Sequence, residues 1–150
     1  MKSFISKTMT AVVMLTALFA FSPKFGAEGF EILLNNKVVL QQFGKDLNSV
    51  KSLDLSNLSA SDKLSVRYHH CGQIGKNRVV TIKDGANTLI KEFRFADVST
   101  AVGEMVINVK DIPGLNLTKT VTLKIYYRST ELPNGRQLAT ISAGSALASK

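Results

Sequence analysis

The sequence predicts an all-β protein, an antiparallel β-sandwich of about eight strands that is Ig-like or jelly-roll-like. Apolar and polar residues alternate along several short runs, which is typical of strands with one buried face. Gly, Pro, Asn and Asp separate these runs at short intervals, as they do in sandwiches and barrels. The Cys…Trp…Cys pattern of true Ig domains is absent, since the chain has one Cys and no Trp. A jelly roll or a small barrel therefore stays open as the alternative.

The first part of the chain is predicted to be an export signal, residues 1–27. Lys2 and Lys7 form a positive start, and residues 10–21 are an apolar core of suitable length. That core is short for a membrane span, which needs roughly 20 apolar residues. We expect an exported protein, periplasmic or extracellular, with no membrane span once the signal is removed. Three cleavage positions are compatible with the sequence, after Ala20, Ser22 or Ala27.

The remainder reads as one domain, residues 28–143, followed by a small polar tail, residues 144–150, that we expect to be flexible. The signal contains three of the 19 basic residues and no acidic one, which leaves 16 basic against 11 acidic residues, a net charge of about +5. These basic residues are spread along the chain without the clustered stripe that nucleic-acid binding requires. We expect no nucleic-acid partner.

The first strands form a predicted hairpin, Phe30–Leu34 and Lys37–Phe43. Asn35-Asn36 joins them, and Asn tolerates the positive φ of a two-residue turn. Residues 50–58 alternate weakly and fit an edge strand. In Lys63–His70 the alternation is clean, so this run is predicted to bury one face of a strand.

A second hairpin is predicted from Asn77–Lys83 and Thr88–Phe95, joined through an Asp-Gly step. Residues 96–103 follow as a loop or a short helical turn with Asp97 as its cap. Three further strands complete the expected set: residues 104–110, 118–129 and 137–143.

His69, His70 and Cys71 are the only dense group of metal-capable side chains in the sequence. Neighbours on a strand point to opposite faces, so His69 and His70 do not suit one ion, whereas His69 and Cys71 could share a face. A zinc site needs three or four protein ligands, and no spacing supplies the others. A metal- or thiol-dependent site at His69 and Cys71, with Arg67 adding positive charge, is one alternative function. The structural alternative packs His70 against Tyr68 and buries Cys71 at the strand end.

A polar and aromatic surface is the best indication of binding. Lys124, Tyr126 and Arg128 alternate with apolar residues and share one face of a strand, and Arg67 and His69 would extend that face if the two strands were neighbours. Tyr combined with Arg or Lys is typical of recognition surfaces. The same residues also suit an ordinary solvated sheet face.

No catalytic motif accompanies these residues: there is no phosphate-binding loop of the expected spacing and no nucleophile elbow. The sequence predicts an exported, non-enzymatic binding or structural protein of the bacterial envelope or exterior, without a cofactor. Its expected partner is an envelope protein or an anionic polymer. A carrier of a small apolar ligand inside a barrel is the third alternative.

Overall fold

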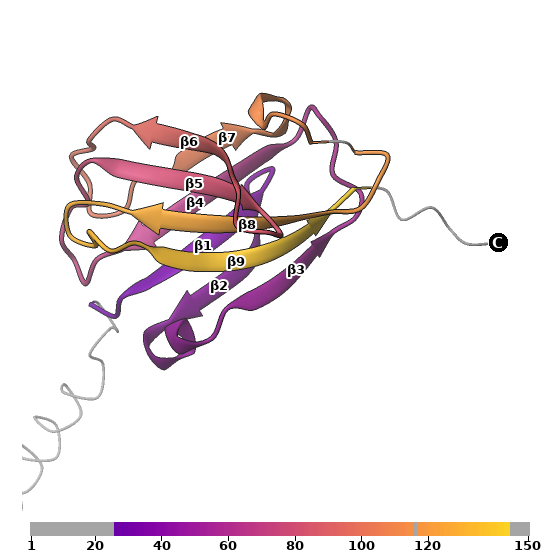
Figure 1. Ribbon diagram of the computed structural model, residues 1–150. Coiled ribbons are helices and arrows are strands. Elements are labelled where there is room, and N and C mark those ends of the chain that lie inside the picture. Colours follow the sequence, from indigo (N-terminus) through magenta and orange to yellow (C-terminus); the bar gives the residue numbers. More distant parts are fainter. Residues whose placement is uncertain (1–25, 116, 145–150) are drawn as a thin grey trace, which may run out of the picture.

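The computed structural model describes residues 26–115 and 117–144, and this part of the chain is all-β (Figure 1). It contains nine strands and two short 3-10 helices, with no α-helix among the described residues. The strands are β1 (Gly29–Leu34), β2 (Lys37–Phe43), β3 (Lys51–Leu55), β4 (Lys63–His69), β5 (Arg78–Asp84), β6 (Leu89–Phe95), β7 (Met105–Asn108), β8 (Val121–Arg128) and β9 (Arg136–Ala143). The 3-10 helices are η1 (Gly44–Asn48) and η2 (Val109–Asp111).

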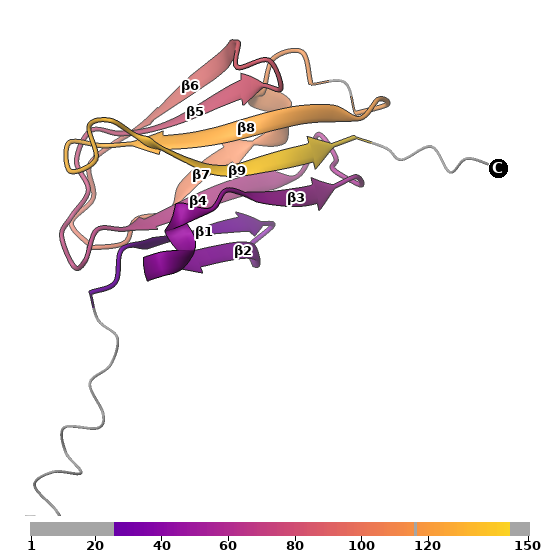
Figure 2. The same cartoon turned by 60° about the horizontal axis from the view of Figure 1, so that its bottom comes forward.

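The strands form two sheets that lie face to face (Figure 2). The four-stranded sheet has the order β2-β1-β4-β7, and the five-stranded sheet has the order β3-β9-β8-β5-β6. Every pair is antiparallel except β3 with β9, which is parallel. The expectation of a purely antiparallel arrangement is therefore wrong at this edge. Alternation along β3 shows which side chains face inward, but strand direction depends on the partner, which only the fold supplies.

The first hairpin forms as the sequence predicts. Asn35 and Asn36 have φ values of 50° and 68°, the left-handed conformation that a two-residue hairpin turn requires. The Asn35 side chain also fixes this turn to the start of β4. Its Nδ2 donates to Asp62 Oδ1 at 2.8 Å, and its Oδ1 accepts from the Lys63 backbone N–H at 2.9 Å.

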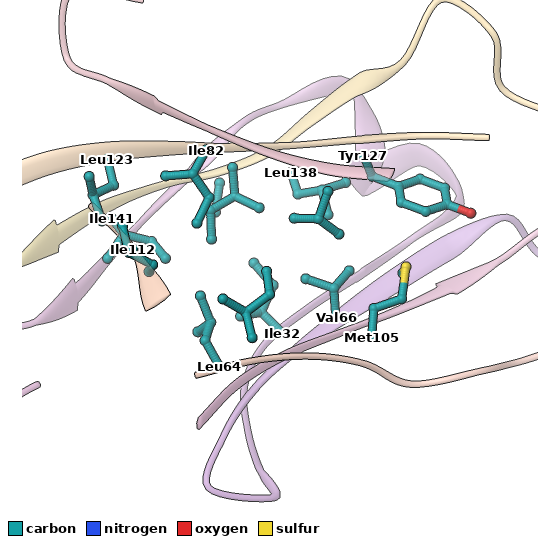
Figure 3. Packing of buried hydrophobic residues seen from close by; sticks show 14 of the residues in the cluster. Ile32, Leu64, Val66, Ile82, Met105, Ile112, Leu123, Tyr127, Leu138 and Ile141 are labelled. Atoms are coloured by element: carbon teal, nitrogen blue, oxygen red, sulfur yellow. The ribbon is translucent and has the colours of Figure 1, made fainter. Parts of the chain in front are cut away.

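The core lies between the two sheets, and β4 and β8 supply much of it (Figure 3). Leu64, Val66 and Tyr68 of β4 are buried on one face. Leu123, Ile125 and Tyr127 of β8 are buried opposite them, which confirms the inward faces predicted for both strands. The remaining fully buried members come from the neighbouring strands and from η2: Phe30, Ile32, Val80, Ile82, Met105, Ile107, Val109, Leu138, Ala139, Ile141 and Ala143.

The hairpin of β5 and β6 also matches its prediction, and the segment after it is a loop. Residues 96–103 contain no helical turn, so Asp97 does not cap a helix. Its Oδ1 instead accepts from the Asn77 backbone N–H at 2.8 Å. The buried Arg78 side chain donates to the backbone carbonyls of Ala96 and Gly103 and so holds both ends of the loop.

The predicted signal segment, residues 1–27, lies outside the described residues except for Gly26 and Ala27, and the predicted tail lies outside them except for Gly144. Within the described residues no helix has the length and apolar character needed to cross a membrane.

Candidate functional site

The structure divides the predicted recognition surface between the two sheets. Arg67 and His69 belong to β4 of the four-stranded sheet, whereas Lys124, Tyr126 and Arg128 belong to β8 of the five-stranded sheet. In each strand these side chains alternate with buried core residues, so they lie on the outer faces of different sheets. The two groups therefore do not form one continuous surface.

Arg67 is paired with carboxylates on the four-stranded sheet. Its guanidinium donates to Glu104 Oε2 at 2.8 Å and lies 3.6 Å from Glu31 Oε2. The hydrogen bond from Arg67 lowers the pKa of Glu104 below its usual value. His69 Nε2 is 3.9 Å from the same Glu31 carboxylate. The positive charge on this face is thus balanced within the protein, and it offers little to an external anion.

The outer face of the five-stranded sheet is centred on Tyr126. Its hydroxyl donates to Gln137 Oε1 on β9 at 3.0 Å. Lys83 Nζ from β5 lies 4.7 Å from the centre of the Tyr126 ring, a cation–π contact. Tyr126 pairs in register with Thr81, and Glu92 of β6 pairs with Thr81 on its other side.

Four basic side chains surround Tyr126, and we call Lys83, Arg94, Lys124 and Arg128 the cationic face. Lys83 and Lys124 lie directly opposite each other in the register of β5 and β8. Arg94 and Arg128 flank Val79 two residues beyond the row of Thr81, Tyr126 and Glu92. Glu92, in the row between the lysines and the arginines, is the one carboxylate among these described groups, and its oxygens lie 3.2 Å from Arg94 and 3.4 Å from Arg128. Together these five groups carry a net charge of +3.

The two lysines of the cationic face have no carboxylate partner among the described ion pairs. Lys124 Nζ donates to the neutral Asn87 Oδ1 at 2.7 Å, and Lys83 contacts the Tyr126 ring. Like charges placed opposite each other destabilise a sheet. The pairing of Lys83 with Lys124 is therefore unfavourable to folding unless an anion lies between or over them.

A hollow of about 370 Å³ opens beside Tyr126. Thr81, Lys83 and Glu92 line it together with the turn at Asn134 and Gly135. Its size is within the range of ligand sites, roughly 300 to 1,000 Å³. The cationic face thus combines an aromatic ring, unbalanced positive charge and a concave surface.

Sequence reasoning found Lys124, Tyr126 and Arg128 but missed Lys83, Glu92 and Arg94. Alternation along β5 and β6 is the signal that could have placed the missing residues on outward faces. It did not show that β8 pairs with β5, a contact between segments about 45 residues apart. Basic residues that are scattered in the sequence are therefore gathered by the topology.

His69 and Cys71 line a second hollow, of about 460 Å³, together with Phe43 and His70. Cys71 is exposed and has a φ of 53°, so the expectation of a small buried group at the strand end is wrong. The reason is that β4 ends at His69 and the chain turns, with a single bridge from His70 to Gln73. Within residues 26–115 and 117–144, no three His, Cys, Asp or Glu side chains are grouped to hold a metal ion.

His70 belongs to a buried polar network at the same end of the molecule. Its Nε2 lies 2.9 Å from the Tyr127 hydroxyl and 3.3 Å from Ser129 Oγ. The Tyr68 and His70 rings are 4.7 Å apart, which confirms the predicted packing of His70 against Tyr68. A side chain at Gly75 would place its Cβ 3.1 Å from both His70 and the Tyr127 hydroxyl, so glycine leaves room for this network.

We expect the protein to become less stable as the pH falls, because of His70. Burial lowers the pKa of His70 below its ordinary value of 6.5. As the pH falls through 6.5, the unfolded chain therefore takes up a proton before the folded one, and stability declines until the pH reaches the folded-state pKa. The loss amounts to roughly 1.4 kcal/mol for each unit by which the two pKa values differ.

Urea unfolding at pH 7.5, 6.5 and 5.5 measures this effect. In His70→Gln the decline over this range should shrink, whereas His69→Gln, which removes the neighbouring imidazole on the outer face, should keep it. An unchanged slope in His70→Gln would show that another group is responsible.

Comparison with known proteins adds no relative. No protein-family model matches the chain, and no curated protein matches its sequence. The assignment of a function therefore depends on the geometry of the cationic face and of the His70 end of the molecule.

Proposed function

We propose that this is an exported, non-enzymatic β-sandwich protein of the bacterial envelope or exterior that binds an anionic polymer through the cationic face. The observation that carries the proposal is the direct opposition of Lys83 and Lys124 beside Tyr126; within the described residues neither lysine pairs with a carboxylate. An anionic ligand would relieve this repulsion, so the face gains more from binding than a balanced surface does.

The two sheet faces differ in a way that supports this choice. On the four-stranded sheet the one central cation, Arg67, lies between Glu31 and Glu104. On the five-stranded sheet the cationic face has four cations and one carboxylate, Glu92, which pairs with Arg94 and Arg128. The chain thus balances charge on one outer face and leaves it unbalanced on the other. Export is supported only by the composition of residues 1–27.

We also propose that the sandwich is Ig-like rather than a jelly roll. The order β1-β4-β7 in one sheet corresponds to strands A, B and E of an Ig domain, and β9-β8-β5 in the other corresponds to strands G, F and C. The binding surface would then be the outer face of the sheet that contains G, F and C. The lack of the Cys…Trp…Cys pattern separates the chain from true Ig domains.

The double variant Lys83→Gln/Lys124→Gln tests the proposed function. We expect the purified protein to be retained on at least one of three immobilised polyanions (hyaluronan, polyphosphate or polyglutamate) and not on neutral dextran. Retention should weaken as salt rises, because salt screens exposed charges. The double variant should lose most of this retention.

The matched control is Lys37→Gln/Lys63→Gln, which removes the same charge from exposed positions on the four-stranded sheet. This control should keep the retention of the unmodified protein. Equal losses in both double variants would mean that only net charge matters, and full retention by Lys83→Gln/Lys124→Gln would place binding elsewhere. Either result contradicts the proposal.

A further inference from the structure

We infer that the polymer bound by the cationic face is an acidic polysaccharide in which anionic and neutral sugars alternate. This inference depends on the proposed function and adds the chemical class of the ligand. It follows from the order of groups along β8 and its neighbours: a cationic row, an aromatic and polar row that contains one carboxylate, and a second cationic row.

The two cationic rows are separated by one row of different character. Lys83 and Lys124 form the first row, and Arg94 and Arg128 form the other. Lys124 and Arg128 are four residues apart on one strand, which places their Cα atoms roughly 13 Å apart at about 3.3 Å per residue. Anionic groups that contact both rows must therefore be separated by an intervening unit of the ligand.

The middle row suits a neutral unit rich in hydroxyl groups. It contains the Tyr126 ring, the Thr81 and Gln137 side chains and the Glu92 carboxylate. An aromatic ring can pack against the apolar face of a sugar, while hydroxyl and amide groups exchange hydrogen bonds with its hydroxyls. Tyr126, Thr81 and Glu92 all line the hollow of about 370 Å³, which is large enough for one sugar ring.

Glu92 makes the middle row unsuitable for an anion. Its two oxygens already lie 3.2 Å from Arg94 and 3.4 Å from Arg128, and ionised carboxylates only accept hydrogen bonds. A sugar hydroxyl can donate to it, but a carboxylate, sulfate or phosphate at this position would be repelled. Polyphosphate, and a polysaccharide with a charge on every sugar, each place an anion over this row.

The test compares two oligosaccharides of equal length by calorimetry. One is a hyaluronan oligosaccharide, in which glucuronate alternates with a neutral sugar; the other is an oligogalacturonate, which carries a carboxylate on every sugar. We expect the hyaluronan oligosaccharide to bind at least about tenfold more tightly, although the oligogalacturonate has more charge. Tyr126→Ala should weaken this binding about tenfold, as is typical of a central aromatic anchor, and Tyr126→Phe should retain it.

The variant Glu92→Gln identifies the cause of the preference. Removal of this carboxylate frees Arg94 and Arg128 to bind any anion. The informative quantity is therefore the ratio of the affinity for the hyaluronan oligosaccharide to the affinity for the oligogalacturonate. It should fall toward one in Glu92→Gln while the far-UV spectrum of the folded protein stays unchanged.

Three results would overturn the inference, and they differ in what they leave standing. In the first, the oligogalacturonate binds as tightly as the hyaluronan oligosaccharide or more tightly, and that binding is abolished in the Lys83→Gln/Lys124→Gln variant. In that case the proposed alternation of anionic and neutral sugars is wrong, and the proposal of anionic-polymer binding stands. If neither oligosaccharide nor any polyanion named above binds, both proposals fail. A partner that proves to be an acidic protein, retained through Lys83 and Lys124, also removes the polysaccharide assignment.

Discussion

Replacing Tyr127 by alanine is expected to lower the free energy of unfolding by about 3 to 5 kcal/mol, the usual cost of removing a buried aromatic ring. Tyr127 is 1% exposed, and its ring stacks on Tyr68 with centroids 4.4 Å apart. The substitution removes this contact and leaves a cavity between the two sheets. It also removes the hydroxyl that lies 2.9 Å from His70 Nε2.

The variant Tyr127→Phe separates the two contributions. It keeps the stacked ring and loses only the hydroxyl, so His70 retains Ser129 Oγ at 3.3 Å as its hydrogen-bond partner. A loss of about 1 to 3 kcal/mol is expected, the cost of leaving a buried polar group with one partner fewer. Urea unfolding followed by far-UV circular dichroism measures both variants. If Tyr127→Ala costs no more than Tyr127→Phe, the stacked ring pair does not stabilise this end of the core.

Replacing Ile82 by alanine is expected to lower the free energy of unfolding by about 2 to 5 kcal/mol. Ile82 lies on β5, the strand that also carries Lys83 of the cationic face. Ile82 is 0% exposed and points toward the opposite sheet (Figure 3). Loss of its side chain removes buried apolar surface and leaves a cavity that the sheets close only in part. The smaller change Ile82→Val should cost about 0.5 to 1.5 kcal/mol.

Val50 provides the control for this measurement. It lies just before β3 and is 49% exposed, so Val50→Ala should change the free energy of unfolding by no more than about 0.5 kcal/mol. A result for Ile82→Ala inside that range would contradict the assignment of Ile82 to the core. The three variants together test whether burial, rather than apolar character alone, determines the loss.

The cationic face shows why a proposed binding surface can be recognised only in part from a sequence. Lys124, Tyr126 and Arg128 belong to one strand, and alternation places them together. Lys83 and Glu92 belong to two other strands and join them through the β6-β5-β8 order. By contrast, Arg67 and His69 were expected to share this surface, but β4 belongs to the other sheet. Side-chain direction is a local property, whereas the choice of neighbouring strand is not.

Cys71 illustrates the same limit at the end of a strand. Alternation predicted correctly that His70 packs inward against Tyr68. The separate expectation that Cys71 is buried at the strand end is wrong, because β4 ends at His69 and the backbone turns with a φ of 53° at Cys71. The thiol is exposed and lines a hollow with His69, but no third metal-capable side chain joins them within the described ranges.

By itself the sequence determined the all-β class, most strand positions, the Asn35-Asn36 turn and the inward faces of β4 and β8. These features depend on backbone preferences and on the separation of apolar from polar side chains, both of which act over a few residues. Only the tertiary structure decided the parallel pairing of β3 with β9, the distribution of the basic residues between two faces and the opposition of Lys83 with Lys124. Those features follow from contacts between distant segments, which form when the two sheets close over one core.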